Sequence, residues 1–232
     1  MNKWKRATFA AAVLTAVGSV LAVAPVANAT TSPSVIELSD ADLAYFYSVA
    51  DRFGVPEDLQ ESLLAKVKAG VPLDSSTGVA PVSTVMQEVD GFTRTVETFA
   101  DGSVIGSDIE IPRVEPEDGV SARGIAGCTT GSSAGVFYGQ DCWVYTSSLT
   151  MGASFYTSYS RWSTGSSVWN WHTPSINVIG TVTNVKWVPV SGTNSKITLK
   201  WNSQSGGLAT LTTWLTFNAS PTGISQTRGG SW

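Results

Sequence analysis

The chain has 232 residues, with 14 Lys+Arg, 18 Asp+Glu, one His, two Cys and a formal net charge of −4. Two cysteines and one histidine cannot build the usual Cys/His zinc site, and the negative charge argues against a nucleic-acid binder that relies on a basic surface. We predict neither a metal site nor a cofactor, and no nucleic-acid partner. Charged residues make up 14% of the chain, against roughly 25% in an ordinary soluble domain.

Residues 1–29 have the layout of a secretory signal peptide. Three basic residues precede an apolar stretch at 9–23, and Ala27 and Ala29 place small side chains where signal peptidase reads the chain. We expect cleavage after Ala29 and export to the extracellular space by the Sec pathway. A membrane anchor is the alternative interpretation, but the apolar stretch is short and no later window is long enough to span a bilayer.

Residues 30–111 are predicted to form a helical hairpin followed by a three-stranded β-meander. Ser39 is a good N-cap for a first helix with one apolar stripe, Pro56 suits the start of a second, and Gly70 ends it. Two Asp-Gly pairs, a strong signal for tight hairpins, then divide the following stretch into short segments. The three strand candidates are 82–89, 92–99 and 103–111.

Residues 112–123 have the proline, glycine and acidic composition of an exposed linker. Charge divides the chain at the same place. Between residues 30 and 123 there are 17 Asp/Glu and 6 Lys/Arg, whereas residues 124–232 hold one carboxylate, Asp141, and five basic residues. The linker therefore separates an acidic region from a slightly basic one.

Residues 124–232 are predicted to form a Trp-rich, all-β domain. Short stretches such as Ile197, Leu199 and Trp201 alternate with polar residues, and turn-forming residues separate the stretches at fairly regular spacing. We expect an antiparallel β-sandwich or small barrel of six to seven strands. The fold class is thus mainly β, with a small α+β N-terminal region.

Cys128 and Cys142 lie at the start of this region. An even pair of cysteines in an exported chain most simply forms one disulfide. It would close a loop of about 15 residues, which stabilises a fold by roughly 3 kcal/mol in the chain-entropy model. A free reactive thiol or a Cys-His nucleophile is the functional alternative.

The sequence offers little chemistry for an enzyme. Residues 131–135 match the G-x-S-x-G nucleophile elbow, and Asp141 and His172 follow in the order seen in α/β-hydrolases. The elbow requires a strand before it and a helix after it, and neither is predicted, so we interpret these residues as a turn. No pair of carboxylates suits glycoside hydrolysis. We assign no catalytic residue, and an enzyme of another kind would need a pocket that joins His172 and Asp141.

Eight tryptophans follow residue 142, more than a sandwich core of this size needs. The best core candidates are Trp187, Trp201 and Trp214. Trp169 and Trp171 share one side of an extended strand, and Trp162 lies across a short turn from them. We therefore predict a ligand-binding cluster of Trp162, Trp169, Trp171 and His172. An overfull aromatic core is the competing explanation.

Two stretches of the N-terminal region resemble those of a known group of exported proteins. They are Leu63-Leu64-Ala65-Lys66 through Gly70 with Asp74-Ser75-Ser76-Thr77-Gly78 and Pro81-Val82, and Thr98-Phe99-Ala100-Asp101-Gly102-Ser103-Val104. With the signal segment and the second cysteine after Gly127-Cys128, the layout resembles secreted proteins of actinobacteria that have no assigned activity. The resemblance implies export from a Gram-positive cell, and it carries over no catalytic residue to this chain.

These observations favour a secreted, non-catalytic β-domain that binds a glycan, the cell envelope or a membrane surface through exposed aromatic residues. A membrane-active toxin or bacteriocin-like protein is the alternative, because Ser/Thr-rich strands with few charges could rearrange into a barrel with a polar lumen. In either case the acidic N-terminal region could be a pro-segment that is removed by cleavage near Arg123.

Overall fold

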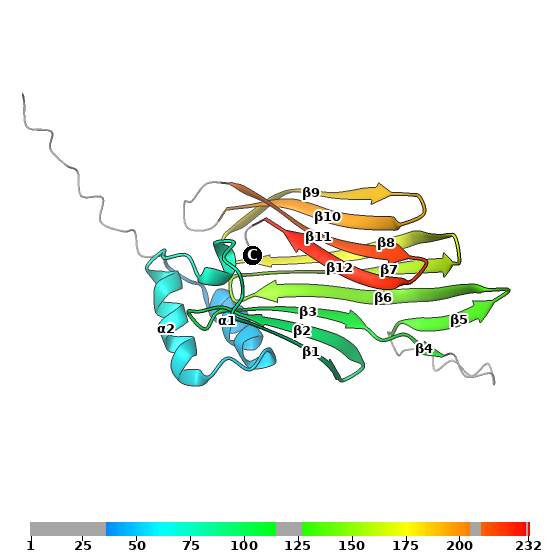
Figure 1. The fold of residues 1–232 in the computed structure, drawn as a ribbon. Helices are drawn as coiled ribbons and strands as arrows, with labels where there is room; N and C mark the ends of the chain where they lie inside the picture. Colours follow the sequence, from blue (N-terminus) through cyan, green and yellow to red (C-terminus); the bar gives the residue numbers. More distant parts are fainter. Residues whose placement is uncertain (1–35, 115–126, 205–209, 231) are drawn as a thin grey trace, which may run out of the picture. The chain divides into compact units, whose positions relative to one another are not determined.

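The computed structural model describes residues 36–114, 127–204, 210–230 and 232. The predicted signal segment with Ala27 and Ala29, and most of the predicted linker at 112–123, lie outside these residues. The described residues form two α-helices, one 3-10 turn and twelve β-strands (Figure 1). None of the helices in these ranges is both long enough and apolar enough to cross a membrane.

Two helices open the described part of the chain, α1 (Asp40–Arg52) and α2 (Glu57–Lys68). Ser39 caps α1 through a capping box, in which Ser39 Oγ accepts from the Asp42 backbone N–H and the Asp42 carboxylate accepts from the Ser39 N–H. Gly54, with φ of 72°, makes the turn into α2, which begins directly after Pro56. A short 3-10 turn, η1 (Asp74–Ser76), follows α2.

The larger sheet, which we call sheet A, contains eight strands of the described chain. They are β1 (Ser83–Val89), β2 (Phe92–Thr98), β3 (Val104–Glu110), β4 (Arg113–Val114), β5 (Thr129–Ser133), β6 (Val136–Ser148), β7 (Met151–Trp162) and β8 (Gly165–Val178). All neighbours pair antiparallel except β4 and β5, which pair parallel. The meander β1–β2–β3 occupies the three predicted segments, and β3 pairs with β6. The strands on the two sides of the predicted linker therefore share one sheet.

The smaller sheet, sheet B, has four antiparallel strands in the order β12-β11-β10-β9. They are β9 (Thr181–Val190), β10 (Ser195–Gln204), β11 (Leu211–Ser220) and β12 (Gly223–Gly229). Their inward residues, which include the fully buried Trp201 and Phe217, form one core with Val144 and Phe155 of sheet A. The two sheets make a sandwich and do not close into a barrel.

The described residues after position 127 contribute eight strands to the two sheets, where the sequence predicts six to seven. The extra strand is β5, which lies in a Gly/Ser-rich stretch that the sequence analysis assigns to a turn. The turn itself is only Ala134-Gly135, with φ of 49° and 79°. Strands β6, β7 and β8 are also long, with 13, 12 and 14 residues.

The two helices cover the face of sheet A that points away from sheet B. On β6, Val144 belongs to the core between the sheets, and Tyr145 packs against the helices. The ring of Phe53 lies directly on β3, where a Cβ at Gly106 would overlap it. Successive side chains along β6 therefore point alternately to the core between the sheets and to the helices.

Asp101, in the β2–β3 turn, ties this turn to both α2 and η1. Its carboxylate accepts hydrogen bonds from the Ser103 N–H and hydroxyl, the Asp74 N–H and the Lys66 ammonium. Burial acts to raise the pKa of Asp101, but the hydrogen bonds from Ser103, Asp74 and Lys66 together outweigh it and lower the pKa below its ordinary value. Asp101 therefore stabilises the fold in its charged form.

We expect Asp101→Asn to lower the free energy of unfolding by about 2 kcal/mol at pH 7, because several hydrogen bonds to a charged acceptor are weakened. The folded pKa lies below the unfolded one, so this stabilisation is present above the unfolded pKa, near 4, and is lost as the pH falls through the folded value. Urea unfolding at pH 7 and pH 3 should show the difference between the two proteins shrinking with acid. Asp58→Asn, at the exposed start of α2, is the control. An equal loss of stability in Asp101→Asn at pH 7 and at pH 3 would contradict the assignment.

Candidate functional site

Three β-bulges interrupt the β6–β7 and β7–β8 ladders of sheet A. The register between β6 and β7 shifts between Gly139 and Cys142, and the register between β7 and β8 shifts on both sides of Tyr156. The extra positions hold Asp141, Asn170 and Thr173, whose φ angles are 52°, 51° and 50°. A left-handed backbone at a residue other than glycine costs of order 1–3 kcal/mol, and threonine tolerates it poorly because its Cβ is branched.

The bulges bring together side chains from strands that are distant in sequence. Asp141 Oδ1 accepts a hydrogen bond of 3.0 Å from Asn170 Nδ2 and lies 3.3 Å from His172 Nε2. On the other side of the imidazole, His172 Nδ1 lies 2.9 Å from Thr173 Oγ1. The ring of Tyr156, the cross-strand neighbour of His172, stacks on the imidazole at 5.6 Å with an interplanar angle of 10°. We call Asp141, Asn170, His172 and Tyr156 the bulge cluster.

The bulge cluster is open to solvent. The side chains of His172 and Asp141 are 43% and 56% exposed. In such a position their mutual attraction is screened by water, so the contact adds little to stability. The cluster presents a carboxylate, an amide and an imidazole to whatever approaches this face of the sheet.

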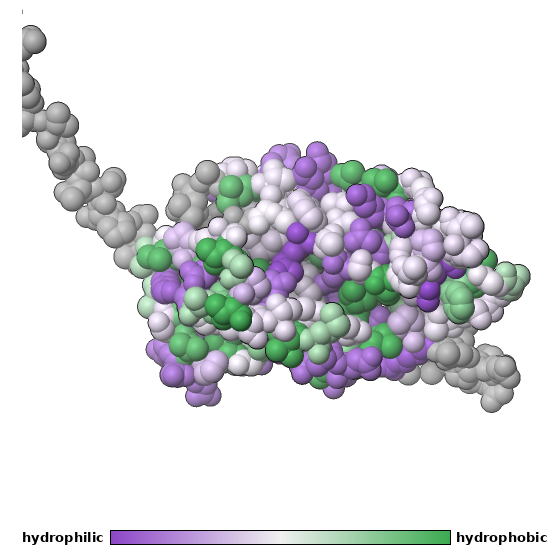
Figure 2. All heavy atoms as spheres, viewed as in Figure 1, coloured by the Kyte–Doolittle hydropathy of each residue, from purple (hydrophilic) through white to green (hydrophobic). Residues whose placement is uncertain are grey.

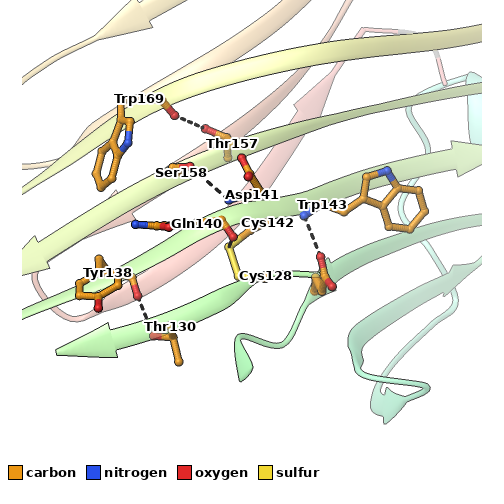
Figure 3. Close-up of a disulfide and its surroundings, with 11 residues drawn as sticks. Cys128, Thr130, Tyr138, Gln140, Asp141, Cys142, Trp143, Thr157, Ser158 and Trp169 are labelled. Carbon is orange, nitrogen blue, oxygen red and sulfur yellow. Dashed lines mark hydrogen bonds between the residues drawn. A yellow bond between two sulfur atoms is a disulfide. The ribbon is translucent and has the colours of Figure 1, made fainter. Parts of the chain in front are cut away.

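The Cys128–Cys142 disulfide lies next to the bulge at Asp141 (Figure 3). Cys128 and Cys142 are bonded to each other and are 1% and 0% exposed, which confirms the predicted pairing. Cys142 follows Asp141 directly, and the Asp141 N–H donates to Ser158 Oγ at 3.1 Å. The disulfide and this hydrogen bond fix the backbone on both sides of the Asp141 carboxylate.

The structure separates the two tryptophans that the sequence analysis places on one side of β8. Trp169 lies opposite Ser158 and is 37% exposed, whereas Trp171 packs against the core between the sheets. The bulge at Asn170 breaks the alternation between them. Of the four predicted binding residues, His172 is therefore part of the bulge cluster, Trp169 lies beside it, and Trp171 faces inward.

Several aromatic rings cover glycines on the neighbouring strand, so they are not surplus. Trp162 lies over Gly165, its cross-strand partner, where a Cβ would overlap the indole. The same arrangement recurs in the cross-strand pairs Tyr138–Gly131, Tyr159–Gly139 and Trp214–Gly229. An aromatic ring over a strand glycine restores packing that the missing side chain would otherwise supply. Trp162 thus has a structural role at the end of the β7–β8 hairpin.

Two of the three core candidates lie in the core. Trp201 is fully buried, and Trp187 packs edge-on against Phe155 at 5.2 Å. The expectation for Trp214 was wrong: it faces outward opposite Lys200, because its neighbour Leu215 points inward on the same strand.

The G-x-S-x-G stretch does not join the histidine and the aspartate. Ser133 ends β5 beside the Ala134-Gly135 turn and pairs with Val136, which lies five residues before Asp141 on β6. At roughly 3.3 Å per residue, this is a separation of about 16 Å. His172 and Asp141 meet, but the serine of this motif is not their nucleophile.

Asn170, Tyr156 and Thr173 were not identified from the sequence. The signal that could have identified the bulge at Asn170 is its residue type. Apart from glycine, Asn and Asp are among the residues that most readily adopt a left-handed conformation. Asn170 also interrupts an aromatic stretch between Trp169 and Trp171. Among the described residues, no group of three or more His, Cys, Asp or Glu side chains is placed to hold a metal ion.

Comparison with protein-family models, with curated proteins and with solved structures gave no match for this chain. We therefore infer the function from the geometry of the bulge cluster and of the residues around it.

Proposed function

We propose that the protein is secreted and binds a glycan of the cell envelope on the outer face of sheet A, with Trp169 and the bulge cluster as the binding site. The disulfide fits an oxidising compartment, and the signal layout of residues 1–29 supports export. We favour binding over catalysis because the serine of the G-x-S-x-G stretch lies away from the cluster and the His172 and Asp141 side chains are open to solvent.

The observation that carries the proposal is the strained backbone of the bulge cluster. The φ angles of Asp141, Asn170 and Thr173 are unfavourable. These residues lie on an exposed surface, where side-chain contacts offset little of the free-energy cost of the strained backbone. Strained backbone of this kind clusters at active and ligand-binding sites, where function requires the geometry that it imposes. Here it aims a carboxylate and an amide at the same patch of solvent, beside an exposed indole.

These groups suit a sugar ring. The indole of Trp169 offers a flat apolar surface for the C–H face of a pyranose. The Asp141 carboxylate accepts hydrogen bonds from hydroxyl groups, while Asn170 both donates and accepts. Ser158 lies between the two parts of the site, since it pairs with Trp169 and accepts from the Asp141 N–H. One sugar unit can therefore contact both parts.

The test is co-sedimentation of residues 30–232 with isolated Gram-positive cell walls, with liposomes as a parallel pellet. We expect wall binding to be released by soluble wall glycan, and Trp169→Ala to weaken it about tenfold, because loss of one aromatic contact removes on the order of 1.4 kcal/mol. Asp141→Asn and Asn170→Ala should also weaken binding.

Phe137→Ala is the matched control. Phe137 is also an exposed aromatic residue of sheet A, 49% exposed, but it lies opposite Arg161, whose guanidinium reaches toward sheet B. Its loss should leave wall binding unchanged. Wall binding of Trp169→Ala equal to that of the parent protein would refute the site. Sedimentation with liposomes alone would instead favour the membrane-active function.

The proposal does not include activation by removal of residues before Arg123. Strands β1–β3 continue sheet A through the β3–β6 pair, and Arg228 of β12 contacts Glu97 of β2 at 2.5 Å. Removal of this region would expose the edge of β6 and the apolar residues that α1 and α2 cover. Such a loss would affect the stability of the sandwich itself.

A further inference from the structure

The outer face of sheet B is basic. Lys186 of β9 lies directly opposite Lys200 of β10, and Lys196 is on the same face of β10. The sequence of β9 to β12 contains no Asp or Glu, and in the described ranges none of these lysines forms an ion pair. Like charges directly opposite each other destabilise a sheet, so the Lys186–Lys200 pair has a cost that no ion pair among the described residues offsets. Figure 2 shows hydrophilic and hydrophobic residues side by side over β9, at the top of the view.

A bulge gathers further polar groups around these two lysines. The register between β9 and β10 shifts between Lys200 and Asn202, and Asn184, in the bulge, has a φ of 54°. As a result Asn184, Val185 and Lys186 all line one open pocket of about 430 Å3. Regular alternation would place only every second residue on one face. The bulge therefore adds an amide group to the lysine pair.

The opposite wall of the pocket is formed by Lys200, Asn202 and Thr212. Thr212 Oγ1 donates to Asn202 Oδ1 at 3.1 Å, so the Asn202 Nδ2 group remains a donor that this contact does not use. Lys200 is half-buried in the central strand β10, and Lys186 is exposed. The pocket is thus lined by two lysines and two asparagines.

We propose that this pocket binds a phosphate group. A phosphate oxyanion between Lys186 and Lys200 would neutralise the like-charge pair, and the two asparagine amides can donate to its remaining oxygens. The shared chemistry is a phosphate with one or two negative charges, whether it belongs to a soluble phosphodiester or to a lipid headgroup. This site is on the other sheet from the glycan site and does not depend on it.

The test is the thermal unfolding midpoint in increasing inorganic phosphate, with sodium chloride added to hold the ionic strength constant. A ligand that binds only the folded state raises the midpoint, and at twenty times its dissociation constant we expect a shift of about 4 °C. Lys186→Gln and Lys200→Gln should lose the shift. Lys196→Gln is the matched control, because it removes the same charge from the same face without lining the pocket, and it should keep the shift.

A second measurement separates binding from a general charge effect. In phosphate-free buffer at low salt, Lys200→Gln should melt no lower than the parent protein, since the like-charge repulsion is gone. A phosphate shift that persists in Lys200→Gln, or one that disappears equally in Lys196→Gln, would overturn the proposal. Pelleting with phosphatidylglycerol vesicles that requires Lys200 would assign the phosphate to a lipid headgroup, and a phosphate shift without such pelleting would assign it to a soluble phosphate.

Discussion

Replacement of Asp108 by alanine is expected to lower the free energy of unfolding by about 4 kcal/mol, the largest effect of any single side chain discussed for this fold. Asp108 lies on β3 under the helices and its side chain is 0% exposed. Its carboxylate accepts from Arg94 Nε at 2.9 Å and Arg94 Nη2 at 3.0 Å, and also from the guanidinium of Arg52. One buried carboxylate therefore pairs with two arginines.

Without Asp108 both arginines would lose this partner, and their side chains are only 12% (Arg94) and 33% (Arg52) exposed. The guanidinium of Arg52, in the last turn of α1, lies 4.8 Å from the centroid of Tyr145 and 5.5 Å from that of Trp143. The hydrogen bonds that Arg94 donates to Asp108 raise the pKa of Arg94 above its ordinary value. Arginine stays protonated in proteins even without such a partner, so Arg94 keeps its charge when the carboxylate is lost. Two unpaired cations would face each other where α1 meets sheet A, and the helix would lose its main polar attachment.

Urea unfolding followed by circular dichroism measures the loss. Glu97→Gln is the comparison, because Glu97 also pairs with an arginine, but the two side chains are 23% and 20% exposed, and we expect about 1 kcal/mol there. A triple variant, Asp108→Leu with Arg52→Met and Arg94→Met, should recover much of the stability, since apolar replacement of a whole buried ion group is often nearly neutral. A loss below 1 kcal/mol in Asp108→Ala would mean that water reaches the arginines and that the helices are loosely held.

The elements that the sequence predicts well are those with local causes. The Ser39 cap, the Pro56 start of α2 and the Asp90-Gly91 turn each depend on residues within a few positions of one another. Asp90 and Gly91 have φ of 52° and 83°, the conformation that an Asp-Gly hairpin requires. The disulfide was predictable for a different reason, because two cysteines allow a single pairing.

The bulge cluster could not be predicted in the same way. A bulge shifts the register by one residue, so every side chain beyond it changes face relative to simple alternation. For this reason Trp171 points inward while Trp169 does not, and Asp141 meets Asn170 from 29 residues away. Whether β3 is an edge strand or pairs with a further strand also depends on distant residues, because its partner β6 lies beyond the predicted linker. Contacts of this kind have no local sequence signal.

Loss of the disulfide is expected to affect both stability and the site. In Cys128→Ser/Cys142→Ser, the free energy of unfolding should fall by about 3 kcal/mol, because the bond closes a loop with a sequence separation of 14. The variant should also lose order at Asp141, whose backbone is fixed by Cys142 on one side. Urea unfolding measures the first effect, and the NMR signals of the His172 ring, next to Asp141, report the second.

The two effects have different physical origins, so they can be separated. The stability loss arises mainly in the unfolded chain, which gains freedom when the loop is open, whereas the change at His172 arises in the folded state. Both cysteines are at most 1% exposed, so a reductant should attack only molecules that have opened locally, and reduction of the native protein should be slow. Reduced wild-type protein should then match the double variant in both measurements, and reoxidation should restore the original His172 signals. An unchanged His172 spectrum in a destabilised double variant would show that the bulge at Asp141 is held by the Ser158 hydrogen bond alone, and that the disulfide serves only stability.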